Sequence, residues 1–80
     1  MKLKSCLVGM TIVAKADFSI SNNDVVSGHR STNPDATYRF IGGNSSLVLV
    51  VEDTRIIVES FGCIFKTDPK LWKKVVDTRH

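Results

Sequence analysis

The sequence predicts a single all-β domain spanning residues 1–80. Ten Val and six Ile outnumber five Leu, and branching at Cβ favours the pleated surface of a strand. Two runs of β-branched and aromatic residues, 47–51 and 56–65, flank the polar turn Glu52-Asp53-Thr54-Arg55, which is the pattern of a β-hairpin. A chain of 80 residues has a narrow stability margin and little room for a buried cleft beside its core.

The first strand is expected over residues 7–16, with Gly9 as a bend or bulge. Alternation along the strand places Met10, Ile12 and Ala14 on one face. Because this face is the more apolar of the two, we expect it to point into the core.

A long polar segment, residues 17–37, follows the first strand and is rich in Ser, Asn, Asp and Gly, which form turns. A loop of about 20 residues is unusual in so small a domain, and such loops are often functional or mobile. The apolar residues Phe18, Ile20 and the Val25-Val26 pair suggest a folded-over, irregular hairpin. Pro34 is expected in a turn.

The middle of the chain predicts three more strands, over residues 38–41, 47–51 and 55–65. Gly42-Gly43-Asn44 ends the first of them, since these residues adopt positive φ at low cost. Residues 47–51 are apolar at both odd and even positions, so both faces of this strand are apolar. We therefore expect it at the centre of the sheet with both faces covered. Gly62 is expected to bend the last strand.

The C-terminal segment predicts a helical turn, because Thr67 or Asp68 can cap it and Pro69 suits the first helical position. Two continuations are possible: a short helix through Val76, or one turn followed by a strand over residues 73–76. The Val75-Val76 pair favours the strand.

The location is expected to be cytoplasmic. No apolar run approaches the ~20 residues that cross a bilayer, and the N-terminal apolar stretch, interrupted by Lys15, is too short for a signal peptide. Cys6 and Cys63 lie within apolar runs and are expected to be buried free thiols. A disulfide is the alternative, and it would imply an oxidising compartment.

The order of the expected elements resembles an SH3-like barrel. The opening Leu7-Val8-Gly9-Met10-Thr11-Ile12-Val13 and the closing residues 65–75 are similar to those of small phage and bacterial SH3-like modules. The resemblance implies a five-stranded barrel with a long first loop and a short helical turn near the C-terminus. A five-stranded open sheet with a terminal helix fits the same pattern.

The resemblance further implies a phage or prophage accessory protein that binds and modulates a host protein. Signalling SH3 domains grip proline-rich peptides with an acidic loop and an aromatic first strand. Here the loop contains His29-Arg30 with a lone Asp24 and Asp35, and the first strand has no tyrosine. Binding of proline-rich peptides is therefore not expected.

No set of residues predicts a cofactor, a metal or an enzyme. Cys6, His29, Cys63 and His80 lack the paired spacing typical of zinc sites. Cys63 lies within an apolar strand, which raises the pKa of a thiol rather than activating it. Glu52-Asp53 are expected to be solvated in their turn.

The net charge of +3 lies entirely in residues 66–80, which contain five basic and two acidic side chains. Trp72 among Lys70, Lys73 and Lys74 combines stacking with phosphate attraction, as in RNA or single-stranded DNA binders. Two alternatives stand beside this one: the lysines are simply solvated, and Trp72 closes the core while lysine stems surround it.

Protein binding is the favoured function, and nucleic-acid binding through the basic C-terminal patch is the alternative. A small domain with a long loop and no catalytic constellation suits an adaptor or inhibitor. Strong β runs also leave edges that a homodimer would cover. The turn 52–55 is expected to point away from the binding face, whose expected residues come from the loop, its exit and the closing turn: His29, Arg30, Tyr38, Trp72, Lys73 and Lys74.

Overall fold

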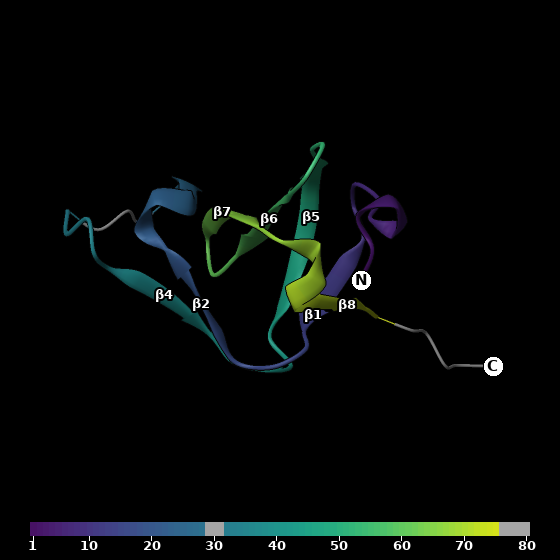
Figure 1. Cartoon of the computed structure of the whole chain (residues 1–80), viewed down its shortest axis with the longest axis horizontal. Helices are drawn as coiled ribbons and strands as arrows, with labels where there is room; N and C mark the ends of the chain where they lie inside the picture. The colour runs from purple at the N-terminus through teal and green to yellow at the C-terminus, as the bar shows by residue number, and fades with distance from the viewer. Residues whose placement is uncertain (29–31, 76–80) are drawn as a thin grey trace.

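The computed structural model describes residues 1–28 and 32–75, and this part of the chain forms two antiparallel sheets (Figure 1). The larger sheet has six strands in the order β3-β7-β6-β5-β1-β8. Its strands in chain order are β1 (Thr11–Ala14), β3 (Val25–Ser27), β5 (Ser45–Val51), β6 (Ile56–Ser60), β7 (Cys63–Thr67) and β8 (Trp72–Lys74). The smaller sheet pairs β2 (Phe18–Ser21) with β4 (Thr37–Phe40).

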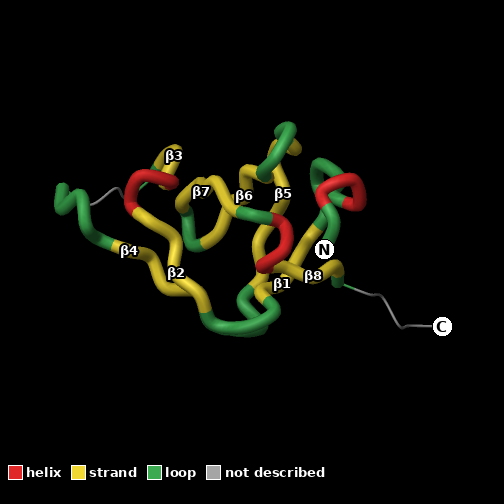
Figure 2. Tube along the Cα trace, in the orientation of Figure 1, coloured by secondary structure: helices red, strands yellow, loops and turns green. Residues whose placement is uncertain are grey.

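Three single 3₁₀ turns connect or precede these strands (Figure 2). They are η1 (Leu3–Ser5), η2 (Asn22–Asp24) and η3 (Pro69–Leu71). The all-β prediction is confirmed, but the described residues form eight strands rather than five. The larger sheet does not close into a ring, because β3 and β8 are its two edges.

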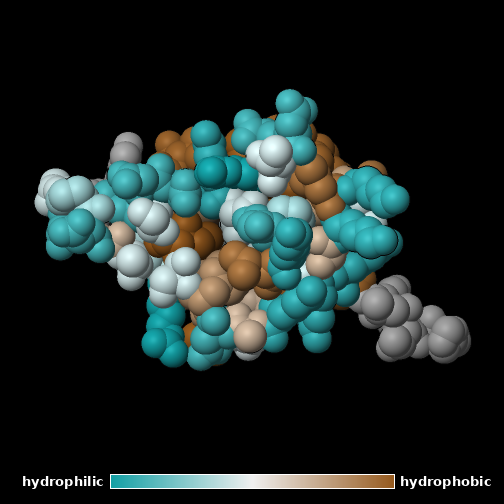
Figure 3. All heavy atoms as spheres, viewed as in Figure 1, coloured by the Kyte–Doolittle hydropathy of each residue, from teal (hydrophilic) through white to brown (hydrophobic). Residues whose placement is uncertain are grey.

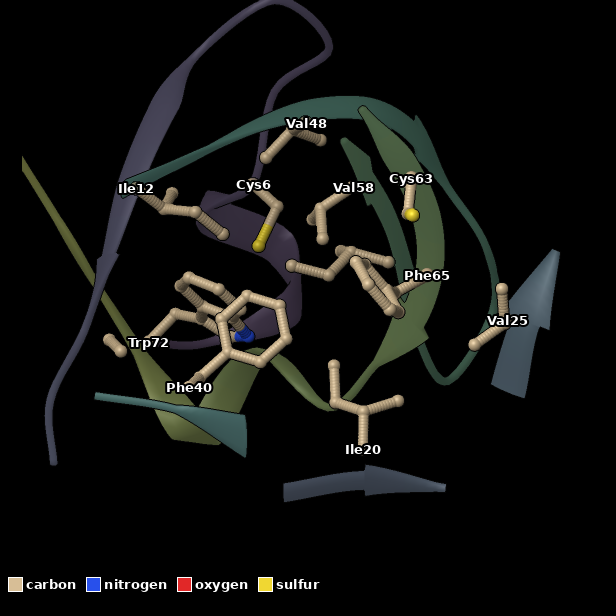
Figure 4. Close-up of a cluster of buried hydrophobic side chains, with 12 residues drawn as sticks. Cys6, Ile12, Ile20, Val25, Phe40, Val48, Val58, Cys63, Phe65 and Trp72 are labelled. Atoms are coloured by element: carbon tan, nitrogen blue, oxygen red, sulfur yellow. The ribbon is translucent and has the colours of Figure 1, made fainter. Parts of the chain in front are cut away.

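The core lies between the two sheets, and Phe40 of β4 is at its centre (Figure 4). Its ring stacks on Phe18 at a centroid distance of 5.2 Å and meets Phe65 and Trp72 edge-on at 5.2 and 5.5 Å. Edge-to-face contacts of this kind add stability beyond the buried area. The β2–β4 sheet is thus held on the larger sheet through aromatic contacts.

The first strand is shorter than predicted, since Leu7, Val8 and Gly9 form a turn before β1. The predicted inward face is nevertheless confirmed: Ile12 and Ala14 are buried, and Met10 packs against the core.

The segment 17–37 folds back as an irregular hairpin, since Ser21 pairs with Thr37 and the Asn22 N–H donates to the Ala36 carbonyl, but Val25 leaves this hairpin. β2 pairs with β4, whereas β3 leaves this sheet and pairs with β7 at Val25 and Ser27. Val25 is buried in the core against the larger sheet. Burial of this apolar residue explains why the chain crosses from one sheet to the other within the three residues of η2.

The predicted central position of β5 is confirmed, but only one of its faces is covered. Ser46 and Val48 are buried, while Leu47 and Val50 are 37% and 44% exposed. The register shifts between Val48 and Val50, as in a β-bulge. The apolar residues at both parities therefore reflect a bulge and an uncovered outer face rather than burial on two sides.

Residues 55–65 form two strands, not one long bent strand. Phe61 and Gly62 have φ of 54° and 75° and connect Ser60 to Cys63. Two consecutive positive φ values in a two-residue loop define a type I′ hairpin turn. Gly62 therefore reverses the chain direction instead of bending a strand.

The C-terminal prediction of a single helical turn followed by a strand is confirmed. Asp68 Oδ1 accepts a hydrogen bond from the Lys70 N–H at 2.9 Å, and Pro69 occupies the first position of η3. The strand β8 begins at Trp72, one residue earlier than expected, and pairs with β1. The predicted strand end at Val76 lies outside the described residues.

Both cysteines are buried and free, as predicted. Burial raises the pKa of the Cys6 thiol, which disfavours the reactive thiolate. In the described ranges there is no helix with the length and apolar character needed to span a membrane.

Candidate functional site

A groove of about 550 Å³ opens between β2, η2, the turn 52–55 before β6, the end of β7 and η3. Figure 3 shows a hollow at this position, with apolar atoms at its floor and polar side chains around it. Its lining residues are Ser19, Ile20, Ser21, Asp24, Thr54, Arg55, Lys66, Thr67, Asp68 and Leu71.

Strand register brings the charged side chains of the groove together. Ile56 pairs with Thr67, so Arg55 and Asp68 lie at the same end of the β6–β7 hairpin. Arg55 Nη1 also contacts Asp24 Oδ1 of η2 at 3.3 Å. This ion pair joins elements that are 31 residues apart in sequence.

The floor of the groove is apolar and rigid. Ile20 is only 4% exposed and packs in the core, while Leu71 of η3 is 38% exposed. The buried Thr67 Oγ1 accepts a hydrogen bond from Trp72 Nε1 at 3.0 Å. The groove thus combines fixed walls with one accessible aliphatic side chain, a combination typical of binding sites.

The turn 52–55 lies beside the groove, which differs from the binding face predicted from the sequence, so the predicted direction of the turn relative to that face stays a prediction. Thr54 and Arg55 both line the groove, because a hydrogen bond from the Glu52 N–H to the Arg55 carbonyl at 2.8 Å closes the turn beside β7. β2, which lies in the segment predicted as a long loop, and η3 line the same groove.

The six residues predicted to form one binding face do not gather on one face where they are described. His29 and Arg30 lie outside the described residues. Tyr38 is half-buried, and its hydroxyl donates to Asn22 Oδ1 at 3.3 Å. Lys73 and Lys74 are exposed on β8, an edge of the larger sheet, whereas Tyr38 belongs to the smaller sheet (Figure 1).

Trp72 is not available to a partner, because its side chain is 0% exposed. It meets the Phe18 ring edge-on at 5.4 Å in addition to Phe40. The structure therefore supports the alternative in which Trp72 closes the core. Its two lysine neighbours, Lys73 and Lys74, remain exposed.

Sequence reasoning missed Arg55, Lys66 and Ser19 as lining residues of the groove. One signal was present: Asp68-Pro69 marked the 3₁₀ turn, and any residue paired across the hairpin from Asp68 would lie beside it. Finding Arg55 in this way required the register of the β6–β7 hairpin, which depends on recognising the Phe61-Gly62 turn.

A second cluster lies at the base of the β2–β4 sheet, around Asp17. Asp17 Oδ1 accepts a hydrogen bond from the Gly42 N–H at 2.9 Å, and Oδ2 pairs with Arg39 Nη2 at 3.1 Å. The Gly42 hydrogen bond, followed by Arg39, lowers the pKa of Asp17 below its usual 3.8. The carboxylate thereby ties the entry of β2 to the exit of β4.

Replacement of Asp17 by Asn is expected to lower the urea midpoint of unfolding at pH 7 and to flatten its acid dependence. A lowered pKa in the folded state means that the charged carboxylate stabilises the fold above 3.8. This contribution is lost as pH falls below that value and through the folded-state pKa. Urea titrations of both proteins between neutral and acidic pH measure the difference, which should shrink in acid. A difference that stays constant with pH would contradict this role of the charge.

Within residues 1–28 and 32–75, no three His, Cys, Asp or Glu side chains lie close enough together to hold a metal ion. Two polar groups of the groove have structural partners within the protein. Ser21 Oγ accepts the Asn23 N–H at 3.2 Å as the cap of η2, and Asp24 pairs with Arg55.

No family model, no curated protein and no solved structure matches the chain.

Proposed function

We propose that this protein is a non-enzymatic protein-binding module that accepts a segment of its partner in the groove between β2, the turn 52–55, β7 and η3. The observation that supports this most directly is the groove itself, whose volume of about 550 Å³ falls within the range of typical ligand sites. Its walls belong to regular strands and a capped 3₁₀ turn, so the site is formed before binding.

The chemistry of the groove suits a polypeptide. Its lining offers two cations, two carboxylates, four hydroxyl side chains and the apolar Ile20 and Leu71. Such mixed lining matches the alternation of backbone amides and varied side chains in a peptide. No aromatic residue is among the lining side chains, so proline-rich ligands, which dock on aromatic grooves, are not the expected class.

The resemblance to SH3-like modules supports the same proposal. A long excursion precedes the central meander β5-β6-β7, and a 3₁₀ turn introduces the last strand, which returns beside the first. Through the likeness of its ends to small phage and bacterial modules, we extend the proposal to an accessory protein that modulates a bacterial host protein.

Nucleic-acid binding is the second candidate, and it now depends on exposed lysines without Trp72. Lys73 and Lys74 are exposed on β8, so they are free to attract phosphates. Because Trp72 is buried, the base stacking that this candidate invoked is not available at that residue.

Replacing Arg55 by Glu is expected to weaken a groove-binding peptide at least ~10-fold, since a central Arg at an interface typically accounts for ~1.4 kcal/mol or more. The peptide would be selected from a random display library on the wild-type protein, and its Kd measured by fluorescence anisotropy. Lys74→Glu is the matched control, with the same change of charge on exposed β8.

The two variants separate the candidates. Loss of peptide affinity in Arg55→Glu but not in Lys74→Glu supports the groove. Failure to select any peptide that depends on Arg55, together with salt-dependent binding of a single-stranded oligonucleotide that Lys74→Glu abolishes, would replace it with the nucleic-acid candidate.

A further inference from the structure

One backbone edge of β2 is open toward the groove. The Asn22 N–H donates to the Ala36 carbonyl at 2.9 Å, which marks Asn22 and Ala36 as a hydrogen-bonded pair. In the same register, Ile20 pairs with Tyr38 and Ser19 pairs with Arg39. Because hydrogen-bonded and non-hydrogen-bonded pairs alternate, the N–H and C=O of Ser19 point away from β4.

The Ser19 backbone groups that point away from β4 face the groove, which Ser19, Ile20 and Ser21 line. β4 covers the other edge of β2, so within the described residues β2 pairs with one strand only. An unpaired strand edge beside a cavity is a template for one more strand.

The opposite wall is also strand edge. The type I′ turn makes Ser60 and Cys63 a hydrogen-bonded pair, and alternation along the register then directs the backbone of Lys66 away from β6. β3 covers that edge of β7 no farther than Phe65. The groove therefore lies between two stretches of extended backbone, Ser19–Ser21 and Lys66–Asp68, that belong to different sheets.

The charges indicate which side chains suit the groove. Lys66 has no ion pair among the described residues, and Arg55 contacts Asp24 through one nitrogen only. Asp68 is engaged as the cap of η3. The two cations and two carboxylates of the lining balance in formal charge, so Lys66, which forms no ion pair in the described part of the chain, is the cation available to an acidic side chain of a ligand. Leu71 offers the exposed apolar contact.

Strand spacing then sets a pattern. Ser21 continues directly into η2, which contains Asp24, the ion-pair partner of Arg55. Leu71 precedes Trp72, which contacts Phe18 at the other end of β2. The end of the groove at Arg55 and the end at Leu71 are separated by about two residues of β2, or ~7 Å. Side chains two residues apart on a strand point to the same side, so one bound strand can reach both ends.

We propose that the partner segment binds as an added β-strand: it pairs with Ser19 of β2 and becomes the third strand of the β2–β4 sheet. It places an apolar side chain on Leu71 and, two positions away, an acidic side chain near Arg55 and Lys66. This inference rests on the proposed function and specifies how the segment is held.

The first test uses the peptide selected on the groove, methylated at one backbone nitrogen at a time. Strand addition requires N–H groups at alternate positions only. We expect methylation to weaken binding at least ~10-fold at every second position and less than ~2-fold between them. Uniform tolerance of methylation, with binding still dependent on Arg55, would overturn strand addition while leaving the groove as the site.

The second test changes β2. Ser19→Pro removes the outward N–H, and proline is tolerated on a strand whose N–H faces solvent. We expect this variant to fold and to bind the peptide at least ~10-fold more weakly, whereas Ser19→Ala, which keeps the N–H, binds like wild type. Unchanged affinity in a folded Ser19→Pro would refute the pairing. If this variant does not fold, the methylated peptides decide. If no peptide that depends on Arg55 can be selected on the wild-type protein, the proposed function itself is refuted.

Discussion

Replacing Trp72 by Ala is expected to lower the free energy of unfolding by about 3–5 kcal/mol, as for other large aromatic residues in cores. The side chain is 0% exposed and packs edge-on against Phe18 and Phe40 at 5.4 and 5.5 Å. Its removal also leaves the buried Thr67 Oγ1 without the Nε1 donor at 3.0 Å. Because a small domain has only about 5–15 kcal/mol of stability, this loss removes a large fraction of it.

Far-UV circular dichroism in urea is the suitable measurement, since Trp72 is the single tryptophan of the chain and fluorescence is lost with it. Leu71→Ala is the control: the adjacent residue is 38% exposed, so its truncation should cost less than about 1.5 kcal/mol. Similar small losses in both variants would show that Trp72 does not close the core.

The position of Trp72 shows why neighbouring charges misled the sequence-based prediction. Successive side chains of a strand point to opposite faces, so Trp72 can be buried while Lys73 is exposed. Lysines beside an aromatic residue are therefore compatible with a core strand. The inward orientation is decided by pairing of β8 with β1, in which Trp72 faces the buried Ala14, and a window of the sequence around Trp72 does not contain that contact.

Features that depend on a few adjacent residues were predicted well. Asp68-Pro69 marked η3 because capping and a fixed φ act within one turn, and the alternation of Ile12 and Ala14 marked the inner face of β1. The Phe61-Gly62 turn was missed, because a bulky residue at positive φ is uncommon. That single omission turned two strands into one and concealed the register of the hairpin.

The groove depends on long-range pairing and was not predictable in the same way. Arg55 and Asp24 meet only because β3 joins β7 while β2 joins β4. The choice between these pairings is set by burial of Val25 and Phe40 in one core. Sequence patterns show that such residues are apolar, but not which strands they bring together.

Gly28→Ala is expected to be the second most damaging single change, at about 2–5 kcal/mol. Gly28 has φ of +103°, and a Cβ placed on it would lie 2.9 Å from both the Cα and the Sγ of Cys63. The conformation alone costs a residue with Cβ about 1–2 kcal/mol. The contact adds about 1–3 kcal/mol of overpacking, since Cys63 belongs to the paired strand β7 and its backbone cannot move away.

Gly9→Ala is the matched control that separates these two contributions. Gly9 also has positive φ, +90°, but a Cβ there would meet no atom within 4 Å, so only the conformational cost of about 1–2 kcal/mol applies. Urea unfolding followed by Trp72 fluorescence measures both variants against wild type. We expect the Gly28 variant to be the less stable of the two, because the backbone at the end of β3 lies against β7 at Gly28, whereas Gly9 has no such neighbour. Equal losses of stability would show that the backbone around Gly28 relaxes and that its close approach to Cys63 does not constrain the end of β3.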